Sequence, residues 1–221
     1  MEPFSDSNLQ FLKVPKCPGK AADLFRIELT SGEMIDPAVF GLRQLTERSF
    51  LLSLAHALDS AVAVGLDIAR RIGWDGERHA WQLGELNRAY YVTAAERAPG
   101  EIEPDEYHRG IAPSVKLLYA VVLRLVDVDL SAAIEFGRRW SLTNSPVHLR
   151  LWAAMARSAR IVPAGEVSAW LLSLGDRHFW DLHGYPEIAE LRATRFAELG
   201  RNFSPRLGEG VGFGGCCQRT A

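Results

Sequence analysis

Residues 111–126, which read I-A-P-S-V-K-L-L-Y-A-V-V-L-R-L-V, decide the fold that this sequence predicts. Apolar residues occupy every side of a helical wheel drawn for this stretch, and only Lys116 and Arg124 carry a charge. A helix with apolar residues on all sides must be buried on most of them. A membrane span needs about 20 apolar residues, and this stretch is shorter. We therefore predict a central helix over residues 111–126, more buried than any other helix of an all-α domain.

The rest of the chain divides into three segments around this helix. We predict an irregular N-terminal arm over residues 1–45, with one short strand at residues 24–29, because prolines and a glycine interrupt its start. Residues 46–200 carry most of the helical signals and form the predicted helical-repeat domain. Residues 201–221 are rich in glycine, lack periodicity and are predicted to form a flexible tail.

Capping residues and prolines place the helices of the middle segment. Helix starts are expected at Thr46, Asp75, Asp127 or Asp129, the triplet Asn144-Ser145-Pro146, Pro163 and Pro186, while Asp176 is expected to start a short turn. Such residues accept backbone N–H bonds in a first helical turn or, in the case of proline, lose no bond there. The helix from Thr46 has Phe50, Leu51, Leu54, Leu58 and Val62 at helical spacing. It either continues as one long helix or turns near Ser60.

A weak internal repeat with a spacing of 33 residues occurs in the same segment. Leu118-Tyr119-Ala120 aligns with Leu151-Trp152-Ala153, and Ile134 aligns with Val167. A period in the thirties with paired helices is typical of helical solenoids, although ordinary helix pairs produce similar coincidences. We predict stacked antiparallel helix pairs in an α-solenoid-like bundle of the HEAT or TPR kind.

The overall composition is that of a globular protein without a basic excess. The chain has 221 residues, of which 48% are hydrophobic, and its formal net charge is −2. A nucleic acid as main partner would favour a clear basic excess, so we expect none. The N-terminus has no secretory pattern, and three cysteines offer no disulfide framework. A cytoplasmic location, without a membrane as partner, is the expectation.

The densest cluster of titratable groups consists of His178, Asp181, His183 and Glu187. A zinc site favours ligands four residues apart on a regular helix, whereas these two histidines flank a Trp-Asp-Leu turn. Asp and His at helix ends commonly cap helices or interact with the helix dipole. We therefore predict no catalytic, cofactor-binding or metal-binding residue, and keep these four side chains as the alternative metal site.

Residues 95–110 form a second group of possible cation ligands, with two prolines and two glycines among Glu101, Glu103, Asp105, Glu106 and His108. This stretch lacks the spacing and the central glycine of an EF-hand. Prolines and glycines break helical periodicity. We predict a long loop whose charged side chains are solvated.

Four phrases of the sequence are distinctive: N-R-A-Y-Y-V (87–92), G-I-A-P-S-V-K-L-L (110–118), S-P-V-H-L-R-L-W-A-A (145–154) and F-W-D-L with P-E-I-A-E-L-R-A-T-R-F (179–196). They resemble the helical regions of large bacterial proteins, some of which carry sirtuin-like or NTPase domains and are suspected of phage defence. The resemblance covers roughly residues 47–205 and includes no catalytic motif. It implies an α-helical scaffold or sensor segment whose effector domain lies elsewhere.

The leading expectation is a non-enzymatic helical scaffold or protein-interaction and sensor module, as a fragment or component of a larger bacterial defence-type protein. Its partner would be another protein or a covalently linked domain, and no cofactor is expected. One alternative is a metal-dependent hydrolase that uses His178, Asp181, His183 and Glu187. The other alternative is a small-ligand sensor with an aromatic-lined pocket between helices.

Overall fold

The computed structural model describes residues 37, 41–71, 86–93, 96–108, 110–143 and 145–199. Within these ranges the chain forms seven α-helices and two short 3-10 helices, and no strand occurs there. The prediction of an all-α fold is confirmed for this part of the chain. The strand predicted at residues 24–29 and the tail predicted at residues 201–221 lie outside the described residues.

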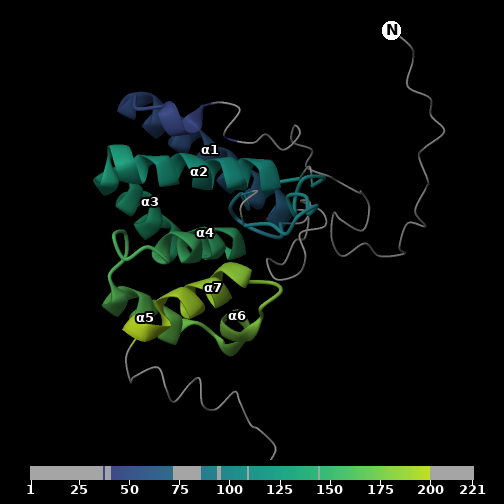
Figure 1. The fold of residues 1–221 in the computed structure, drawn as a ribbon, viewed down its shortest axis with the longest axis vertical. Helices are drawn as coiled ribbons and strands as arrows, with labels where there is room; N and C mark the ends of the chain where they lie inside the picture. The colour runs from purple at the N-terminus through teal and green to yellow at the C-terminus, as the bar shows by residue number, and fades with distance from the viewer. Residues whose placement is uncertain are drawn as a thin grey trace, which may run out of the picture.

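Consecutive helices from α1 to α4 pack on one another. Figure 1 shows α1 and α2 at one end, α3 and α4 in the middle, and α5, α6 and α7 at the other end. Their bounds are α1 Arg48–Arg71, α2 Ala112–Val128, α3 Leu130–Leu142, α4 Pro146–Ala156, α5 Ala164–Ser173, α6 Asp176–Trp180 and α7 Pro186–Arg195, with 3-10 helices η3 at Leu42–Gln44 and η4 at Phe196–Glu198. Helix α1 packs on α2, α2 on α3, α3 on α4, and α7 returns to pack on α4.

The capping signals place several helix starts correctly. The Asp129 carboxylate accepts a hydrogen bond from Ala132 N at 3.1 Å and begins α3. Helices α2, α4 and α7 each have a proline in the first turn, where a missing N–H leaves no bond unmade. Helix α1 runs through Ser60 without a turn, so the long-helix alternative is confirmed.

The core is shared between α2 and α4, so the expectation that residues 111–126 form the most buried helix is wrong. Nine of the 17 residues of α2 are buried, but nine of the 11 residues of α4 are buried. Each of the two helices has two main neighbours, α1 and α3 for α2 and α3 and α7 for α4, so α2 is not the single centre of the core. Trp140 and Trp152 are the largest fully buried side chains.

The repeat spacing matches burial only in part. Leu118 and Leu151, which lie 33 residues apart, are both completely buried. Ile134, however, is 40% exposed, whereas Val167 is completely buried. These two residues therefore do not occupy equivalent places in the stack.

Two stretches differ from the sequence-based expectation. Residues 86–93, predicted to end a helix that starts at Asp75, are irregular. At the end of the predicted N-terminal arm, η3 packs against α2, and Arg124 Nε donates to Leu45 O at 2.8 Å. Packing onto the helical body therefore begins before residue 46.

Candidate interaction face and ligand cavity

A buried cluster of charges forms around Lys116 of α2. Its ammonium is fully buried and lies 2.6 Å from Asp105 Oδ2, and it also contacts the Glu103 carboxylate. Asp105 is itself completely buried, and His108 Nδ1 lies 2.8 Å from its Oδ1. The prediction that the acidic side chains of residues 95–110 are solvated is therefore wrong for Asp105. The pairing explains the burial, because a buried charge is stable only with a partner.

The irregular segment at residues 86–90 is held on both sides by buried charged groups. Asp105 accepts hydrogen bonds from Asn87 N at 2.6 Å and Arg88 N at 3.0 Å. Lys116 donates to Tyr90 O at 3.0 Å. Burial opposes ionisation of Asp105, but the Asn87 N–H and Lys116 together lower the pKa of this carboxyl. The carboxylate thus replaces the backbone acceptors that a helix would have provided.

Arg150 of α4 and Glu187 of α7 hold the same segment from the other side. Arg150 donates to Leu86 O at 2.7 Å and to Asn87 O at 2.9 Å, and binds both oxygens of Glu187. Glu187 is completely buried and accepts from Ala89 N at 2.7 Å. A two-pronged guanidinium–carboxylate pair is among the strongest polar contacts in proteins.

The four residues of the alternative metal site have separate environments. Glu187 points to Arg150, while Asp181 accepts the backbone N–H groups of His183 at 3.1 Å and Gly184 at 2.8 Å. The His178 ring lies edge-on to Tyr185. In the part of the chain that the structure describes, no group of three or more His, Cys, Asp or Glu side chains is placed to hold a metal ion.

A cavity of about 530 Å³ opens beside α2. Its walls come from α2, from the neighbourhood of η3, from residues 90–96 and from Arg157 after α4; they are Pro37, Leu42, Arg43, Tyr90, Tyr91, Thr93, Glu96, Tyr119, Ala120, Leu123, Arg124, Asp127 and Arg157. Ligand pockets in proteins are typically about 300–1,000 Å³ and combine apolar walls with a few polar groups. The cavity has that size and that lining.

Tyr90, Tyr119 and Arg157 are among the polar residues that line this cavity. Tyr90 donates its hydroxyl to Glu190 Oε2 at 2.7 Å, and the Arg157 guanidinium lies 4.4 Å from the Tyr90 ring centre. Burial, with the Glu190 hydrogen bond, raises the pKa of Tyr90 to about 12. Burial also raises the pKa of Tyr119. Both phenols are neutral at physiological pH, and both donate their O–H groups within the protein, Tyr90 to Glu190 and Tyr119 to Ala154 O at 3.3 Å.

The charged side chains on the cavity wall differ in whether they are already paired within the protein. Asp127 is bound by Arg124 Nη1 at 3.2 Å, and Glu96 accepts from Thr93 N and Oγ1, each at 2.9 Å. These Thr93 bonds lower the pKa of Glu96. Arg43 is exposed and has no ion-pair partner among the described residues. The wall therefore offers a cation to an anionic ligand.

The outer side of α1 carries an apolar stripe that we call the α1 stripe. It consists of Phe50, Leu54, Ala57, Ala61, Val64 and Ile68, which follow each other at alternating steps of four and three residues. Phe50 is 50% exposed, Val64 is 59% exposed and Ile68 is 39% exposed. The two alanines are exposed as well, and Leu54 is half-buried. A seam with this spacing is characteristic of a helix that packs against another helix.

The opposite side of α1 is the one that the core uses. Leu51, Ala55, Val62, Leu66 and Ala69 are buried, and α1 lies along α2. Of the described helices, α1 is the one whose length and composition would allow it to cross a membrane, with 22% of the tested window buried.

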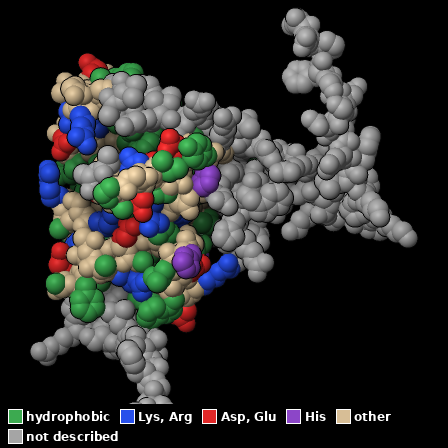
Figure 2. All heavy atoms as spheres, turned by 45° about the vertical axis from the view of Figure 1, so that its right-hand side comes forward, with side chains coloured by type: hydrophobic (Ala, Val, Ile, Leu, Met, Phe, Trp, Pro, Cys, Tyr) green, Lys and Arg blue, Asp and Glu red, His purple; other side chains and the backbone are tan. Residues whose placement is uncertain are grey.

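Charged side chains of the described residues are mixed in sign on the face drawn in Figure 2. On the face drawn in Figure 2, acidic and basic side chains lie side by side among the described residues, and no large area of one sign appears.

Sequence reasoning missed the buried pairs, and it kept an aromatic-lined pocket as an alternative without naming the residues that line it. The partners of Lys116 are 11 and 13 positions away in sequence, and those of Arg150 are up to 64 positions away. Helical periodicity detects apolar faces but not such distant polar partners. The α1 stripe was detectable, because its spacing is regular, but the sequence did not separate it from the buried side of the same helix.

Comparisons with protein-family models, with curated proteins and with solved structures found no match to this chain. The resemblance to helical regions of large bacterial proteins stays a prediction.

Proposed function

We propose that this chain is a non-enzymatic helical interaction module and that the α1 stripe is the surface through which it binds a partner protein. The partner surface is an apolar helix with the same alternating spacing. The module would be an α-solenoid-like stack, used as a scaffold or sensor in a larger bacterial defence-type assembly. The order of helix contacts and the resemblance support this proposal.

The observation that carries the proposal is the exposure of the α1 stripe. Soluble proteins leave single apolar side chains exposed, but contiguous apolar patches mark interaction sites. Here six apolar positions follow one side of a helix of 24 residues, which is about 36 Å long. The stripe is continuous along almost the whole helix.

A pull-down from cells of the source organism tests this proposal with two matched variants. Val64→Glu places a charge in the α1 stripe, and Leu172→Glu places the same charge at an exposed leucine of α5, which is 46% exposed. The proposal predicts that the wild type and Leu172→Glu retain a protein partner that Val64→Glu loses. An untagged copy of the chain itself counts as such a partner. A partner retained equally by all three proteins contradicts it.

A second candidate function, binding of a small anionic ligand in the cavity, rests on a different observation. The cavity joins aromatic walls to Arg43, a cation without an ion-pair partner in the described part of the chain. A thermal-shift screen with nucleotides and with small carboxylates tests this candidate, because a ligand that binds the native state raises the melting temperature. Arg43→Gln should abolish any such rise, and a rise that persists in this variant places the ligand elsewhere.

The metal-dependent hydrolase is the alternative with the weakest support. Glu187 is occupied by Arg150 and Ala89, and Asp181 is occupied by two backbone N–H groups. Metal analysis of the purified protein tests it. A stoichiometric ion that His178→Ala with His183→Ala removes from a folded protein would favour the hydrolase.

A further inference from the structure

We propose that the partner of the α1 stripe is the α1 stripe of a second copy of this chain, packed antiparallel about a two-fold axis at the level of Asp59. This inference rests on the proposed function, because it names the partner of the same surface. Asp59 itself points away from the stripe, since it accepts the Trp140 Nε1 hydrogen bond at 2.8 Å. The position of the two-fold axis along α1 follows from the sequence positions of the stripe residues and from their side-chain sizes.

The sizes of the side chains are symmetric about Asp59. In an antiparallel pair, residues equally distant from the axis face each other: Ala57 faces Ala61, Leu54 faces Val64, and Phe50 faces Ile68. Packed helices cross at an angle, so their axes are closest at the crossing and diverge from it. Alanines at the crossing allow close approach, and progressively larger side chains fill the widening space toward both ends. One and the same surface is therefore complementary to itself, as a two-fold interface requires.

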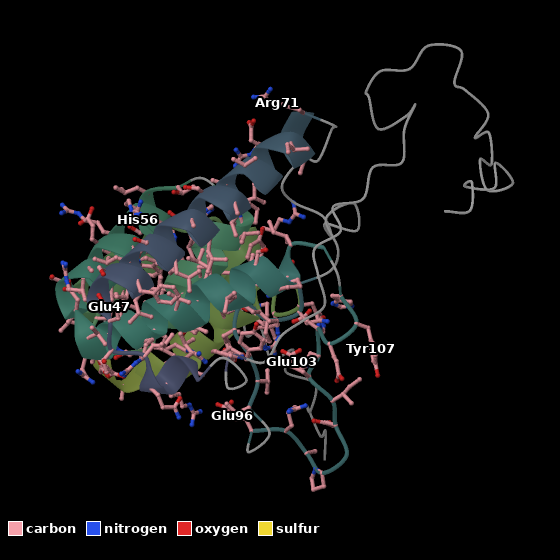
Figure 3. The ribbon with its side chains drawn as sticks, turned by 90° about the horizontal axis from the view of Figure 1, so that it is seen from above. Glu47, His56, Arg71, Glu96, Glu103 and Tyr107 are labelled. Carbon is pink, nitrogen blue, oxygen red and sulfur yellow. The ribbon has the colours of Figure 1, made fainter. Side chains whose placement is uncertain are left out.

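The charges at the ends of the stripe favour the antiparallel direction. The same spacing continues to Glu47 at one end and Arg71 at the other, and both side chains are exposed. Figure 3 looks onto α1 with these two residues labelled at its opposite ends. An antiparallel pair brings Glu47 of each copy against Arg71 of the other. A parallel pair would instead bring like charges together at both ends, which is unfavourable.

The flanks of the stripe favour a helix rather than a lipid surface as its occupant. Ser53, Ser60 and Asp67 border the stripe on one side and are polar, and Asp67 binds Arg71 at 2.8 Å. A helix that lies in a membrane interface carries a broad apolar face and basic residues on its polar face. The α1 stripe is narrow and its neighbours are not predominantly basic, which suits a helical seam.

Sedimentation velocity of the full chain over a range of concentrations gives the first test. We expect a reversible dimer of about 49 kDa, twice the 24.5 kDa of one chain. Val64→Glu should weaken dimerisation by about 100-fold or more, because the dimer buries two unpaired carboxylates in its seam. Leu172→Glu should dimerise like wild type. A wild-type monomer at all concentrations, or a dimer that Val64→Glu leaves intact, overturns the inference.

Charge exchange tests the direction of packing. Glu47→Arg and Arg71→Glu should each weaken the dimer by about five-fold, because two exposed ion pairs are lost in each case. The double variant should regain wild-type affinity, since the pairs are restored with opposite polarity. A double variant no tighter than the single ones overturns the antiparallel arrangement.

Cysteine cross-linking tests the alignment with variants that disturb the fold little. In a chain with Cys17, Cys216 and Cys217 replaced by serine, Ala57→Cys and Ala61→Cys are prepared separately. Oxidation of a mixture of the two should give the cross-linked dimer, while each variant alone should give little, because a disulfide needs Cα atoms within about 7 Å. Cross-links formed equally by each variant alone overturn the inference in favour of a parallel pair.

The outcomes separate this inference from the proposed function. A monomeric wild type that still retains another protein through Val64 in the pull-down refutes the second copy and leaves the interaction module standing. A monomer without any stripe-dependent partner refutes both. A monomer that binds phosphatidylglycerol vesicles, with binding lost in Val64→Glu, refutes both in favour of a membrane surface.

Discussion

The ammonium of Lys116 ties the irregular residues 96–108 to α2 and, through Tyr90 O, to residues 86–93. Sequence alone predicts a helical core position for this residue, with its charge as an interruption of an apolar surface. The structure instead makes the charge the centre of a small polar core, with Asp105 fully buried next to it. Removing one member of such a pair leaves an uncompensated buried charge, which is the costliest kind of single-residue change.

We therefore expect Lys116→Met to lower the free energy of unfolding by about 3–5 kcal/mol. Arg48→Met, which breaks the ion pair of the exposed Arg48 with Asp129, is the matched control and should cost much less. Adding Asp105→Asn to Lys116→Met should recover part of the loss, because it removes the unpaired carboxylate. Urea denaturation measures all three, and equal losses for Lys116→Met and Arg48→Met would refute the paired-charge account.

His148 provides a pH dependence of stability. Burial lowers the pKa of this imidazole, although Asp59, with Oδ1 3.9 Å from Nε2, raises it, and Arg70 and Arg139 lower it. The unfolded chain then binds a proton at a higher pH than the native chain does, so unfolding takes up a proton. The unfolding free energy should fall as the pH drops below about 6.5, the unfolded pKa of histidine, until the native pKa is passed.

Urea titrations at pH 7.5 and pH 5.5 check this expectation. His148→Asn should flatten the difference between the two pH values, while His183→Asn, at an exposed position, should leave it unchanged. A wild type that is equally stable at both pH values would contradict a buried neutral imidazole.

At the level of the elements, the sequence predicts well what apolar periodicity and caps determine. The helix over residues 111–126 appears as α2, Ala112–Val128, because apolar residues surround it and Pro113 suits its first turn. Asp129 begins α3 as its capping chemistry requires. These signals are local, so they can be found without knowledge of the tertiary structure.

The misses occur where distant groups override local preference. Residues 86–93 have apolar side chains at helical spacing, yet Asp105 and Glu187 accept their N–H groups from 17 to 98 positions away. In α1, Phe50 and Leu51 belong to one periodic set in the sequence, but Leu51 is completely buried and Phe50 is 50% exposed. Which apolar face meets the core depends on the neighbours, which a single sequence does not reveal.

Leu118→Asp tests the contribution of α2 to the core. Leu118 is completely buried. We expect the free energy of unfolding of the variant to fall by several kcal/mol, because a new carboxylate at this buried position would have no ion-pair partner among the described residues. The expressed protein should then appear in the insoluble fraction. Leu123→Asp, at a 45% exposed position on the same helix, is the control and should remain soluble. A well-folded Leu118→Asp protein would show that this face of α2 is not packed.

At the level of the whole molecule, α1 has α2 as its main neighbour among the described helices. Stacked helical modules bury an apolar face between neighbours, so a terminal helix needs a polar outer face or a partner. The outer side of helix α1 carries the α1 stripe instead of a polar face, whereas the described residues on the face drawn in Figure 2 mix both signs of charge. This exposed apolar side supports the proposal that α1 is the surface through which this chain binds another polypeptide.

The most direct test of this central claim is the labelling rate of a cysteine placed in the stripe. In the chain without its natural cysteines, Val64→Cys and Leu172→Cys replace two exposed apolar residues of α1 and α5. Maleimide labelling is measured in cells of the source organism and again after urea unfolding. The account predicts that Val64→Cys reacts about ten-fold more slowly than Leu172→Cys in cells, because only a small fraction of the chains has an α1 stripe without a bound partner. After unfolding, the two cysteines should react equally fast. Equal rates in cells would contradict it, since the α1 stripe would then be open to solvent where the protein works.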